Sequence, residues 1–323
     1  MKILVTGGTG QVGSSVVNAL AARGEEVRCL VLKGVSLELL DGLPVDIVEG
    51  DVTVPESLPS IVRGMEAVVH VAGIISYWRK KHTLMQRVNV DGTRNLLEAA
   101  VKAGVKRFLY TSSIASIGYS DDKICDETTE YNWTGMNIGY FDTKRAAELL
   151  VRQEKRLEGL TVNPAIIFGA NDIRKNGVRM LFHVWNGTLP GIPPGTTTVA
   201  VLDDVVAGHL AALDKGRPGE RYILGGTIVS FKELYTRIAK VLGKPLSARV
   251  MSPGKLRFVS GVLDFLSLFT RTEPMVTPEL VKIVTRNRRY SSQKAIDELD
   301  YKPSMLEKGL KACWQWYCNR NLV

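Results

Sequence analysis

The stretch that most constrains the fold of this chain is TGGTGQVG at residues 6–13. The short apolar run Ile3-Leu4-Val5 precedes it and predicts a buried strand. Residues 12–22 have a helical composition, and Gly24 then provides a helix stop. A strand, a glycine turn and a helix in this order are typical of a loop whose N–H groups face phosphates. An ordinary strand–turn–helix corner with incidental glycines is the alternative.

Each glycine of the loop has a predicted use. Gly7 permits the tight turn, Gly10 lets the backbone approach a pyrophosphate, and Gly13 lets the helix pack closely on the strand. The spacing is Gly-x2-Gly-x2-Gly, not the Gly-x-Gly-x2-Gly of most dehydrogenases. The loop and its flanks together predict a dinucleotide cofactor.

Composition is that of an ordinary globular protein, with 323 residues, 45% hydrophobic and 23% charged. The net charge of +9 is spread along the chain, with a late cluster at Arg286, Arg288 and Arg289. Such a cluster can attract nucleic acid or anionic lipid, but it can equally be a solvated face or attract a phosphorylated cofactor. Because no nucleic-acid motif accompanies the charge, we expect no nucleic-acid partner.

Cysteine usage and hydropathy indicate a cytoplasmic protein. The four cysteines, at positions 29, 125, 313 and 318, form no CxxC or CxxH pattern, so we expect reduced thiols and no metal site. No signal-peptide pattern opens the chain, and no run of 18 apolar residues predicts a membrane span. The apolar run 259–269 is short and interrupted by Asp264, which favours a helix of the second lobe or an oligomer contact over a membrane anchor.

Strand and helix patterns alternate through the first half of the chain. Strands are expected at 27–32, 45–48, 67–71, 107–111 and 160–168, and helices at 89–103 and 139–157. This alternation predicts an α/β fold with a Rossmann-type, doubly wound parallel sheet. Polar residues follow several of the strands, so they should meet at the carboxyl edge of the sheet, where such folds bind ligands.

The pattern loosens after residue 170. Strands are expected at 199–202 and 222–224, with helices up to residue 213 and at 231–242. We therefore expect residues 1–170 to form a dinucleotide-binding domain, to which a segment at about 199–225 returns. Residues 171–323 would mainly form a smaller, interleaved substrate lobe.

Tyr140 and Lys144 are four residues apart on a predicted helix, which puts them on one face. A tyrosine with its usual pKa of about 10 is a poor base at neutral pH, and a nearby ammonium would lower that pKa. The pair can therefore act as a general acid–base unit on a substrate hydroxyl. A surface pair on an amphipathic helix is the alternative.

Ser112 and Ser113 follow the strand 107–111, at the expected ligand edge. A serine hydroxyl there can hydrogen-bond a reacting carbonyl and hold it toward Tyr140. Helix capping or a turn is the alternative use of these serines.

These motifs together resemble the extended short-chain dehydrogenase/reductases over nearly the whole chain. The matching segments are TGGTGQVG (6–13), GDV (50–52), HVAG (70–73), NVDGTRNLLEAA (89–100), YTSSIA (110–115), YFDTK (140–144) and SSQKAIDELDYKPS (291–304). NPAIIFG (163–169) and GRPGERYILGG (216–226) look most like the branch of dihydroflavonol-4-reductase-like proteins and hopanoid-associated sugar epimerases.

The resemblance implies roles for the candidate residues. Tyr140 would be the acid/base, Lys144 would lower its pKa and hold the nicotinamide ribose, and Ser113, with Ser112 as the fallback, would orient the substrate oxygen. Asp51 and Val52 would meet the adenine. The full cofactor-binding set is Gly7, Thr9, Gly10, Gln11, Val12, Gly13, Lys33, Asp51, Val52, Ala72, Gly73, Thr111, Tyr140, Lys144, Pro164 and Ile166.

NADP(H) is favoured over NAD(H) as the cofactor. NAD users commonly carry an acidic residue at the end of the second strand, but the sequence there is Leu30-Val31-Leu32-Lys33. Reductase relatives often place an arginine at the position of Leu32, which is also missing. Lys33, with Arg28 as a second candidate, can receive a 2′-phosphate, unless Lys33 is only a solvated loop residue.

Three functions fit the sequence. The first is an NAD(P)-dependent oxidoreductase that interconverts a hydroxyl and a ketone or aldehyde on a small or medium organic substrate. The second is a nucleotide-sugar epimerase with retained cofactor, which needs a pyrophosphate clamp such as Arg174, Arg179, Arg217 and Arg221. The third is a non-catalytic nucleotide-binding or redox-sensing protein. A sugar 4,6-dehydratase is set aside, because no Asp-Glu pair follows Ser112-Ser113.

The substrate loops carry little motif information. Trp78, Tyr131 and Trp133 either line an apolar pocket or anchor loops. The family habit also predicts a homodimer through the helices 89–103 and 140–157.

Overall fold

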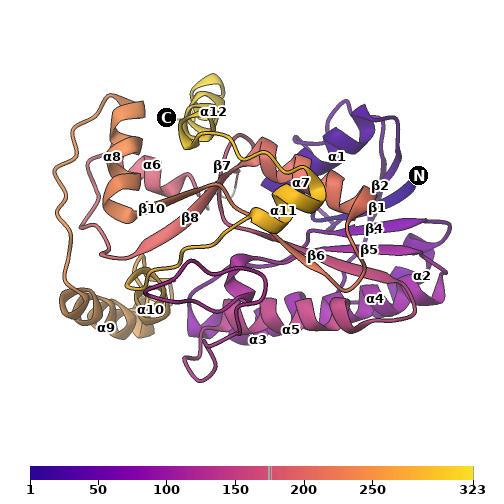
Figure 1. Cartoon of the computed structure of the whole chain (residues 1–323), viewed down its shortest axis with the longest axis horizontal. Helices are drawn as coiled ribbons and strands as arrows, with labels where there is room; N and C mark the ends of the chain where they lie inside the picture. The colour runs from indigo at the N-terminus through magenta and orange to yellow at the C-terminus, as the bar shows by residue number, and fades with distance from the viewer. Residues whose placement is uncertain (174, 176, 323) are drawn as a thin grey trace.

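The computed structural model describes residues 1–173, 175 and 177–322, and its centre is a seven-stranded parallel sheet (Figure 1). The strand order is β3-β2-β1-β4-β5-β6-β9. The strands are β1 (Lys2–Thr6), β2 (Glu26–Val31), β3 (Asp46–Glu49), β4 (Ala67–His70), β5 (Arg107–Thr111), β6 (Glu158–Pro164) and β9 (Arg221–Leu224). The order reverses between β1 and β4, which is the switch point where such sheets bind ligands. The predicted Rossmann-type fold is confirmed.

Helices cover both faces of this sheet (Figure 1). One face carries α1 (Gln11–Ala22), α7 (Leu202–Lys215) and α11 (Gln293–Leu299), and the other carries α2 (Leu58–Val62), α4 (Gly92–Lys102) and α5 (Gly139–Gln153). The strands between them are buried on both faces, which explains their continuous apolar sequence. Helix α1 ends at the predicted place, since Gly24 has a φ of +76°.

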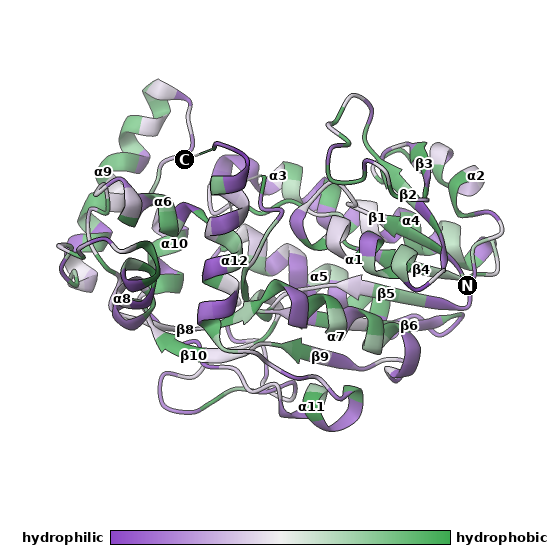
Figure 2. Cartoon of the chain, turned by 90° about the horizontal axis from the view of Figure 1, so that it is seen from above, coloured by the Kyte–Doolittle hydropathy of each residue, from purple (hydrophilic) through white to green (hydrophobic). Residues whose placement is uncertain are grey.

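A second, smaller lobe forms the other end of the molecule (Figure 2). It is built on a three-stranded sheet of β10 (Thr227–Ser230), β8 (Thr196–Val201) and β7 (Ile166–Phe168). Helices α6 (Arg179–Trp185), α8 (Phe231–Leu242) and α12 (Leu306–Asn319) pack around a separate apolar core there. Helices α9 (Pro253–Thr270) and α10 (Pro278–Val284) follow α8 in the chain.

Several element boundaries differ from the sequence prediction. The strand expected at 160–168 is divided at Ala165, so that β6 pairs with β9 in the large sheet while β7 pairs with β8 in the small one. The strand expected at 199–202 is therefore part of β8, in the small sheet. The chain then returns to the large sheet, where α7 packs on one face and β9 is the last strand. The helix expected at 89–103 opens with a π-helical turn at Gln86–Asp91, preceded by α3 (His82–Met85).

No helix within the described part of the chain is long and apolar enough to cross a membrane. Cys29, Cys125 and Cys313 are buried free thiols, and Cys318 is an exposed one.

Candidate active site

The glycine loop between β1 and α1 leaves room for a phosphate group. Gly7 has a φ of +74°, and a Cβ there would lie 2.7 Å from the Ala72 backbone nitrogen. A Cβ on Gly13 would lie 2.1 Å from the Gly7 carbonyl oxygen, so only glycine lets α1 approach β1 this closely. A Cβ on Gly10 would meet nothing nearer than the Gly7 oxygen at 3.4 Å. The space in front of Gly10 is open, as a pyrophosphate requires.

The start of α1 offers N–H donors to that space. Gly10 is the N-cap residue and provides no side-chain cap, so the first amides of the helix, those of Gln11, Val12 and Gly13, have no intrahelical acceptor. Thr9 precedes the cap and is half-buried. The Gln11 side chain turns away, because its Nε2 donates to the carbonyls of Gly169 and Ala170 at 3.2 and 3.0 Å. Gln11 thus ties the loop to the segment after β7.

The residues expected around the adenosine lie at the ends of β2 and β3. Asp51 accepts a hydrogen bond from the Thr53 amide at 2.8 Å, and the buried Val52 accepts one from Asn95 at 3.0 Å. Lys33 is exposed just beyond β2. Arg28 does not fit the role of a second phosphate ligand, because its guanidinium binds Asp46 at 2.6 Å and the Ile61 carbonyl at 3.0 Å.

The loop after β4 is held by buried polar side chains. His70 contacts Thr6 at 2.7 Å, and the same Thr6 hydroxyl accepts from the Ala72 amide at 3.2 Å. Asn89 binds both the amide and the carbonyl of Ile74, at 2.8 and 3.0 Å. Burial, with a smaller contribution from Lys144, lowers the pKa of His70 to about 3, so this ring is neutral. The backbone at Ala72 and Gly73 is therefore fixed in place.

Tyr140 lies in the first turn of α5, and the hydroxyl of Ser113, which follows β5, is near enough to its phenol to favour the phenolate. The Ser113 Oγ also accepts a hydrogen bond from the Ala115 amide at 3.1 Å, so it caps a short helical turn as well. Ser112 turns the other way: its hydroxyl donates to Ser116 at 3.2 Å and its amide to the Val162 carbonyl at 2.8 Å. The structure thus brings Ser113, not Ser112, to the phenol.

Lys144 lies one helical turn after Tyr140 and is buried. Its Nζ donates to the Thr111 carbonyl at 2.8 Å and to the Tyr110 hydroxyl at 3.1 Å. A Cβ on Gly73 would lie 3.4 Å from the same Nζ, so the ammonium also borders the loop after β4. Burial lowers the pKa of Lys144 to about 7, and the Glu148 carboxylate opposes this.

The expected lowering of the Tyr140 pKa by Lys144 is not found. Burial raises the pKa of Tyr140, the neighbouring Tyr77 adds to the rise, and the nearby Ser113 hydroxyl opposes it. The physical reason is desolvation, which disfavours the phenolate more than the Ser113 hydroxyl favours it. Tyr140 is therefore protonated at neutral pH, which is the form that can donate a proton.

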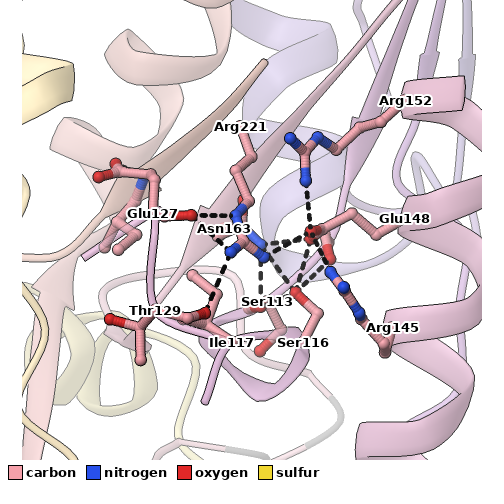
Figure 3. A network of polar contacts seen from close by, with 12 residues as sticks. Ser113, Ser116, Ile117, Glu127, Thr129, Arg145, Glu148, Arg152, Asn163 and Arg221 are labelled. Carbon is pink, nitrogen blue, oxygen red and sulfur yellow. Dashed lines mark hydrogen bonds and ion pairs between the residues drawn. The ribbon is translucent and has the colours of Figure 1, made fainter. Parts of the chain in front are cut away.

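A buried carboxylate, that of Glu148, is the centre of a network of polar contacts that includes Ser113 (Figure 3). Glu148 is fully buried on α5 and accepts from Ser116 and Asn163, both at 2.6 Å. Asn163 also donates to the Ser113 carbonyl at 3.1 Å. Arg221 pairs with Glu148 at 3.1 Å, and Arg145 and Arg152 lie at 3.8 and 3.7 Å. This network fixes the backbone of Ser113, and the sequence analysis missed the role of Glu148.

The remaining candidates lie along the same edge of the sheet. Thr111 ends β5 and its hydroxyl contacts His209 at 3.0 Å. Pro164 ends β6, and the half-buried Ile166 begins β7. The candidates from the glycine loop, β4, β5 and α5 thus converge, while Lys33 lies further out, beyond the end of β2.

Aromatic side chains surround the phenol of Tyr140. The Tyr77 ring packs edge-on against it with centroids 5.9 Å apart. Trp133 is fully buried, packs against Phe141 at 4.9 Å and donates to the Ile117 carbonyl at 3.1 Å, so it anchors its loop. Tyr131 binds Asp142 at 2.8 Å.

Arg288 is a buried cation near these rings. Its guanidinium carbon lies 5.8 Å from the centre of the Phe141 ring, and it donates a long hydrogen bond of 3.4 Å to Thr197. Its Nε is buried without a hydrogen-bond partner, and no carboxylate of the described residues forms an ion pair with it. A buried guanidinium of this kind suits a polar or anionic group of a ligand.

A glycine cradle, an open helix N-terminus and a Tyr–Ser–Lys cluster at the switch point define a dinucleotide-dependent enzyme of the short-chain dehydrogenase/reductase type. The chain belongs to the NAD-dependent epimerase/dehydratase family, whose model matches residues 3–225. The resemblance to the extended short-chain dehydrogenase/reductases is thereby confirmed.

Individual relatives match over the whole chain. Sterol demethylase protein B of Methylococcus capsulatus is 29% identical, with 100% of each chain covered. A Synechocystis protein named as an inferred dihydroflavonol 4-reductase is 30% identical, with 99% of this chain and 95% of that one covered. The crystal structure of gox2253 superposes with a TM-score of 0.88 at 31% identity and covers 99% of both chains.

Proposed function

We propose that this protein is an NAD(P)-dependent oxidoreductase that interconverts a hydroxyl and a ketone or aldehyde of a small or medium organic substrate. The observation that carries the proposal is the placement of the Ser113 hydroxyl next to the Tyr140 phenol, with Lys144 one helical turn further along α5. A protonated phenol beside a serine hydroxyl is suited to donate a proton to a carbonyl oxygen.

The residues of the chain would share the reaction as follows. Ser113 orients the substrate carbonyl, and Tyr140 donates its hydroxyl proton to the oxygen as the alcohol forms. Lys144 would hold the ribose next to Gly73, where its Nζ borders the loop after β4. A bound nicotinamide cofactor supplies the hydride in this direction and accepts it in the reverse one.

The glycine loop would hold the cofactor at its pyrophosphate. The donors are the amides at the start of α1, and the space is that in front of Gly10. Asp51 and Val52 would border the adenine, and Thr111, Pro164 and Ile166 the nicotinamide end. The shape of the glycine loop fits a pyrophosphate. A Cβ at Gly7 or Gly13 would clash with neighbouring backbone atoms and change that shape.

Three observations favour the oxidoreductase over the nucleotide-sugar epimerase. Arg221 is buried and pairs with Glu148, so it is not available as a pyrophosphate clamp, and the exposed Arg217 pairs with Glu298. Arg179 is exposed at the start of α6, and Arg174 lies outside the described residues. The rings around Tyr140 also suit an apolar substrate, in keeping with the name of the Methylococcus relative.

Arg288 is the reason that a nucleotide-sugar epimerase is the second candidate function. Its guanidinium is buried and lies over the ring of Phe141, the neighbour of Tyr140 in the chain, and it can bind the diphosphate of a nucleotide sugar as well as a carboxylate or carbonyl.

Nicotinamide absorbance separates the two candidates. The protein would be mixed with excess NADPH and a panel of ketones, and also with nucleotide sugars. Net loss of NADPH with alcohol formation supports the oxidoreductase. Conversion of a nucleotide sugar with no net change in absorbance supports the epimerase. Turnover by neither route, with cofactor still bound, supports the non-catalytic function.

We propose NADP(H) as the preferred cofactor. No carboxylate follows β2, where Leu32 and Lys33 are exposed, so the lysine is free to meet a 2′-phosphate. Titration of protein fluorescence with NADPH and NADH tests this choice. Lys33→Ala should weaken NADPH binding about tenfold and leave NADH binding unchanged. Equal weakening of both would contradict the preference.

A cytoplasmic homodimer completes the proposal. Free thiols at all four cysteines suit a reducing compartment. The dimer would form through α4 and α5, and analytical ultracentrifugation of the purified chain tests it.

A further inference from the structure

Helix α9 has its apolar side chains on the outside. The residues buried against the protein are Leu256 and two serines, Ser260 and Ser267. Phe258, Phe265 and Phe269 are 74%, 60% and 73% exposed. A globular helix normally has the opposite arrangement, with its apolar stripe toward the core.

The exposed side chains form one continuous surface, which we call the α9 face. It consists of Phe258, Val262, Phe265, Leu266, Leu268 and Phe269. Four of these recur at steps of four, three and four residues, so they lie on one side of the helix. The rings of Phe265 and Phe269 also pack edge-on, with centroids 5.5 Å apart. Figure 2 shows α9 at the edge of the molecule. A contiguous apolar surface of this kind marks a binding site.

Basic residues bracket the α9 face at both ends. Lys255 and Arg257 lie in its first turns, and Arg271 is its C-cap residue. All three are exposed, and none forms an ion pair with an acidic side chain of the described residues. The acidic residue of the helix, Asp264, points inward and pairs with Arg79 at 3.4 Å. The face therefore combines apolar rings with unpaired positive charge.

We propose that the α9 face docks on the surface of an anionic lipid bilayer, with the helix lying in the plane of the interface. Phenylalanine and leucine side chains would enter the acyl boundary, while Lys255, Arg257 and Arg271 would meet anionic headgroups. A second copy of the chain is a poorer occupant. Pairing two α9 helices in either direction would bring basic ends together, and like charges repel.

Docking would bring the candidate active site to the membrane surface. The segment beneath α9 is tied to the helix by a hydrogen bond from Lys80 to the Ser267 carbonyl at 3.2 Å. Ser76 of the same segment donates to Glu273, which follows the helix, at 2.9 Å. Tyr77, within that segment, packs against Tyr140. A cleft of about 270 Å³ lies beside this segment, and Tyr77, Trp78 and Asp264 line it together with charged residues such as Arg79 and Lys282.

Vesicle sedimentation with the full-length protein tests the inference, and its readout does not depend on the proposed activity. Vesicles of phosphatidylcholine with about 30 mol% phosphatidylglycerol should bind the protein at least about tenfold more tightly than vesicles of phosphatidylcholine alone. Raising the salt to about 1 M should reduce that difference, because it screens the headgroup charge.

Two variants and a control make the test specific. Phe265→Ser with Phe269→Ser should weaken binding about tenfold, and Lys255→Glu with Arg257→Glu should remove the preference for phosphatidylglycerol. Met305→Ser changes a 79% exposed apolar side chain outside α9 and should bind like the parent. Circular dichroism and melting temperature verify that each variant is folded.

Three outcomes would overturn the inference. The first is no vesicle binding by the parent, and the second is undiminished binding by both α9 variants when they are folded. The third is a parent oligomer that the phenylalanine variant dissociates while vesicle binding stays the same, which would assign the α9 face to self-association.

Discussion

The ammonium of Lys144 donates a hydrogen bond to the carbonyl of Thr111 at 2.8 Å, so helix α5 is joined directly to the end of strand β5. Burial that accompanies this contact lowers the pKa of Lys144 from 10.5 to about 7. Burying the Lys144 ammonium therefore destabilises the folded state, and the size of this destabilisation depends on pH.

Lys144 should make folding stability rise with pH above neutrality. Between about pH 7 and 10.5 the lysine is protonated in the unfolded chain and increasingly neutral in the folded one, so the unfolded state binds more protons there. Lys144→Met should therefore raise the melting temperature more at about pH 6 than at about pH 9. Calorimetry at both pH values measures the difference, and parallel pH profiles for parent and variant would contradict it.

Tyr140→Phe should lower kcat by about 10²–10⁴-fold, because it removes the proton donor. Cofactor affinity should hardly change, since only the hydroxyl is lost and the ring still packs against Tyr77. Steady-state rates and a binding titration check the two halves of this prediction. Ser113→Ala should lower kcat too, and Ser112→Ala is its matched control, because the Ser112 hydroxyl donates to Ser116. If Ser112→Ala lost as much kcat as Ser113→Ala, the assignment of the two serines would be wrong.

Glu148→Gln should destabilise the fold by about 3–5 kcal/mol, because it leaves the buried Arg221 without its carboxylate. It should also lower kcat more than it changes KM, since the network that holds the Ser113 backbone is loosened. Arg145→Ala, which removes a partner at 3.8 Å, should cost less than about 1 kcal/mol. Urea unfolding and steady-state kinetics measure both effects. An unchanged kcat in a Glu148→Gln protein that melts lower would leave Glu148 a purely structural role.

Gly10→Ala and Gly13→Ala should have different consequences. A Cβ at position 13 would lie 2.1 Å from the Gly7 oxygen, so Gly13→Ala should lose about 1–3 kcal/mol of stability as well as cofactor binding. A Cβ at position 10 would lie 3.4 Å from the same atom, so Gly10→Ala should fold normally and bind cofactor weakly. Melting temperature and a nucleotide titration distinguish the two. Full cofactor affinity in Gly10→Ala would contradict the placement of the pyrophosphate.

Local signals explain why the sheet and the glycine loop could be predicted from the sequence. The turn at Gly7, the apolar strands and the helix stop at Gly24 each depend on neighbouring residues, and each is found where it was expected. The division of 160–168 at Ala165 could not be predicted, because it depends on pairing with β8 and β9, which lie far along the chain.

Burial explains the parts of the site that the sequence did not reveal. The spacing of Tyr140 and Lys144 predicts a shared helix face, but not that desolvation raises the pKa of Tyr140. The partners of Glu148 come from four separate segments, including Ser116, Asn163 and Arg221, so no local pattern marks them. Arg28 has a suitable charge and lies on the expected strand, but its guanidinium is already bound to the Asp46 carboxylate.

The most direct measurement of the central claim is the transfer of deuterium to a ketone substrate from NADPH in which both hydrogens at the nicotinamide C4 are replaced by deuterium. We expect a released alcohol that carries the deuterium on its carbinol carbon, with one NADP⁺ formed for each alcohol, and transfer that is about 10²–10⁴-fold slower with Tyr140→Phe. An unlabelled product, or a converted substrate with no NADP⁺ released, would contradict the central claim.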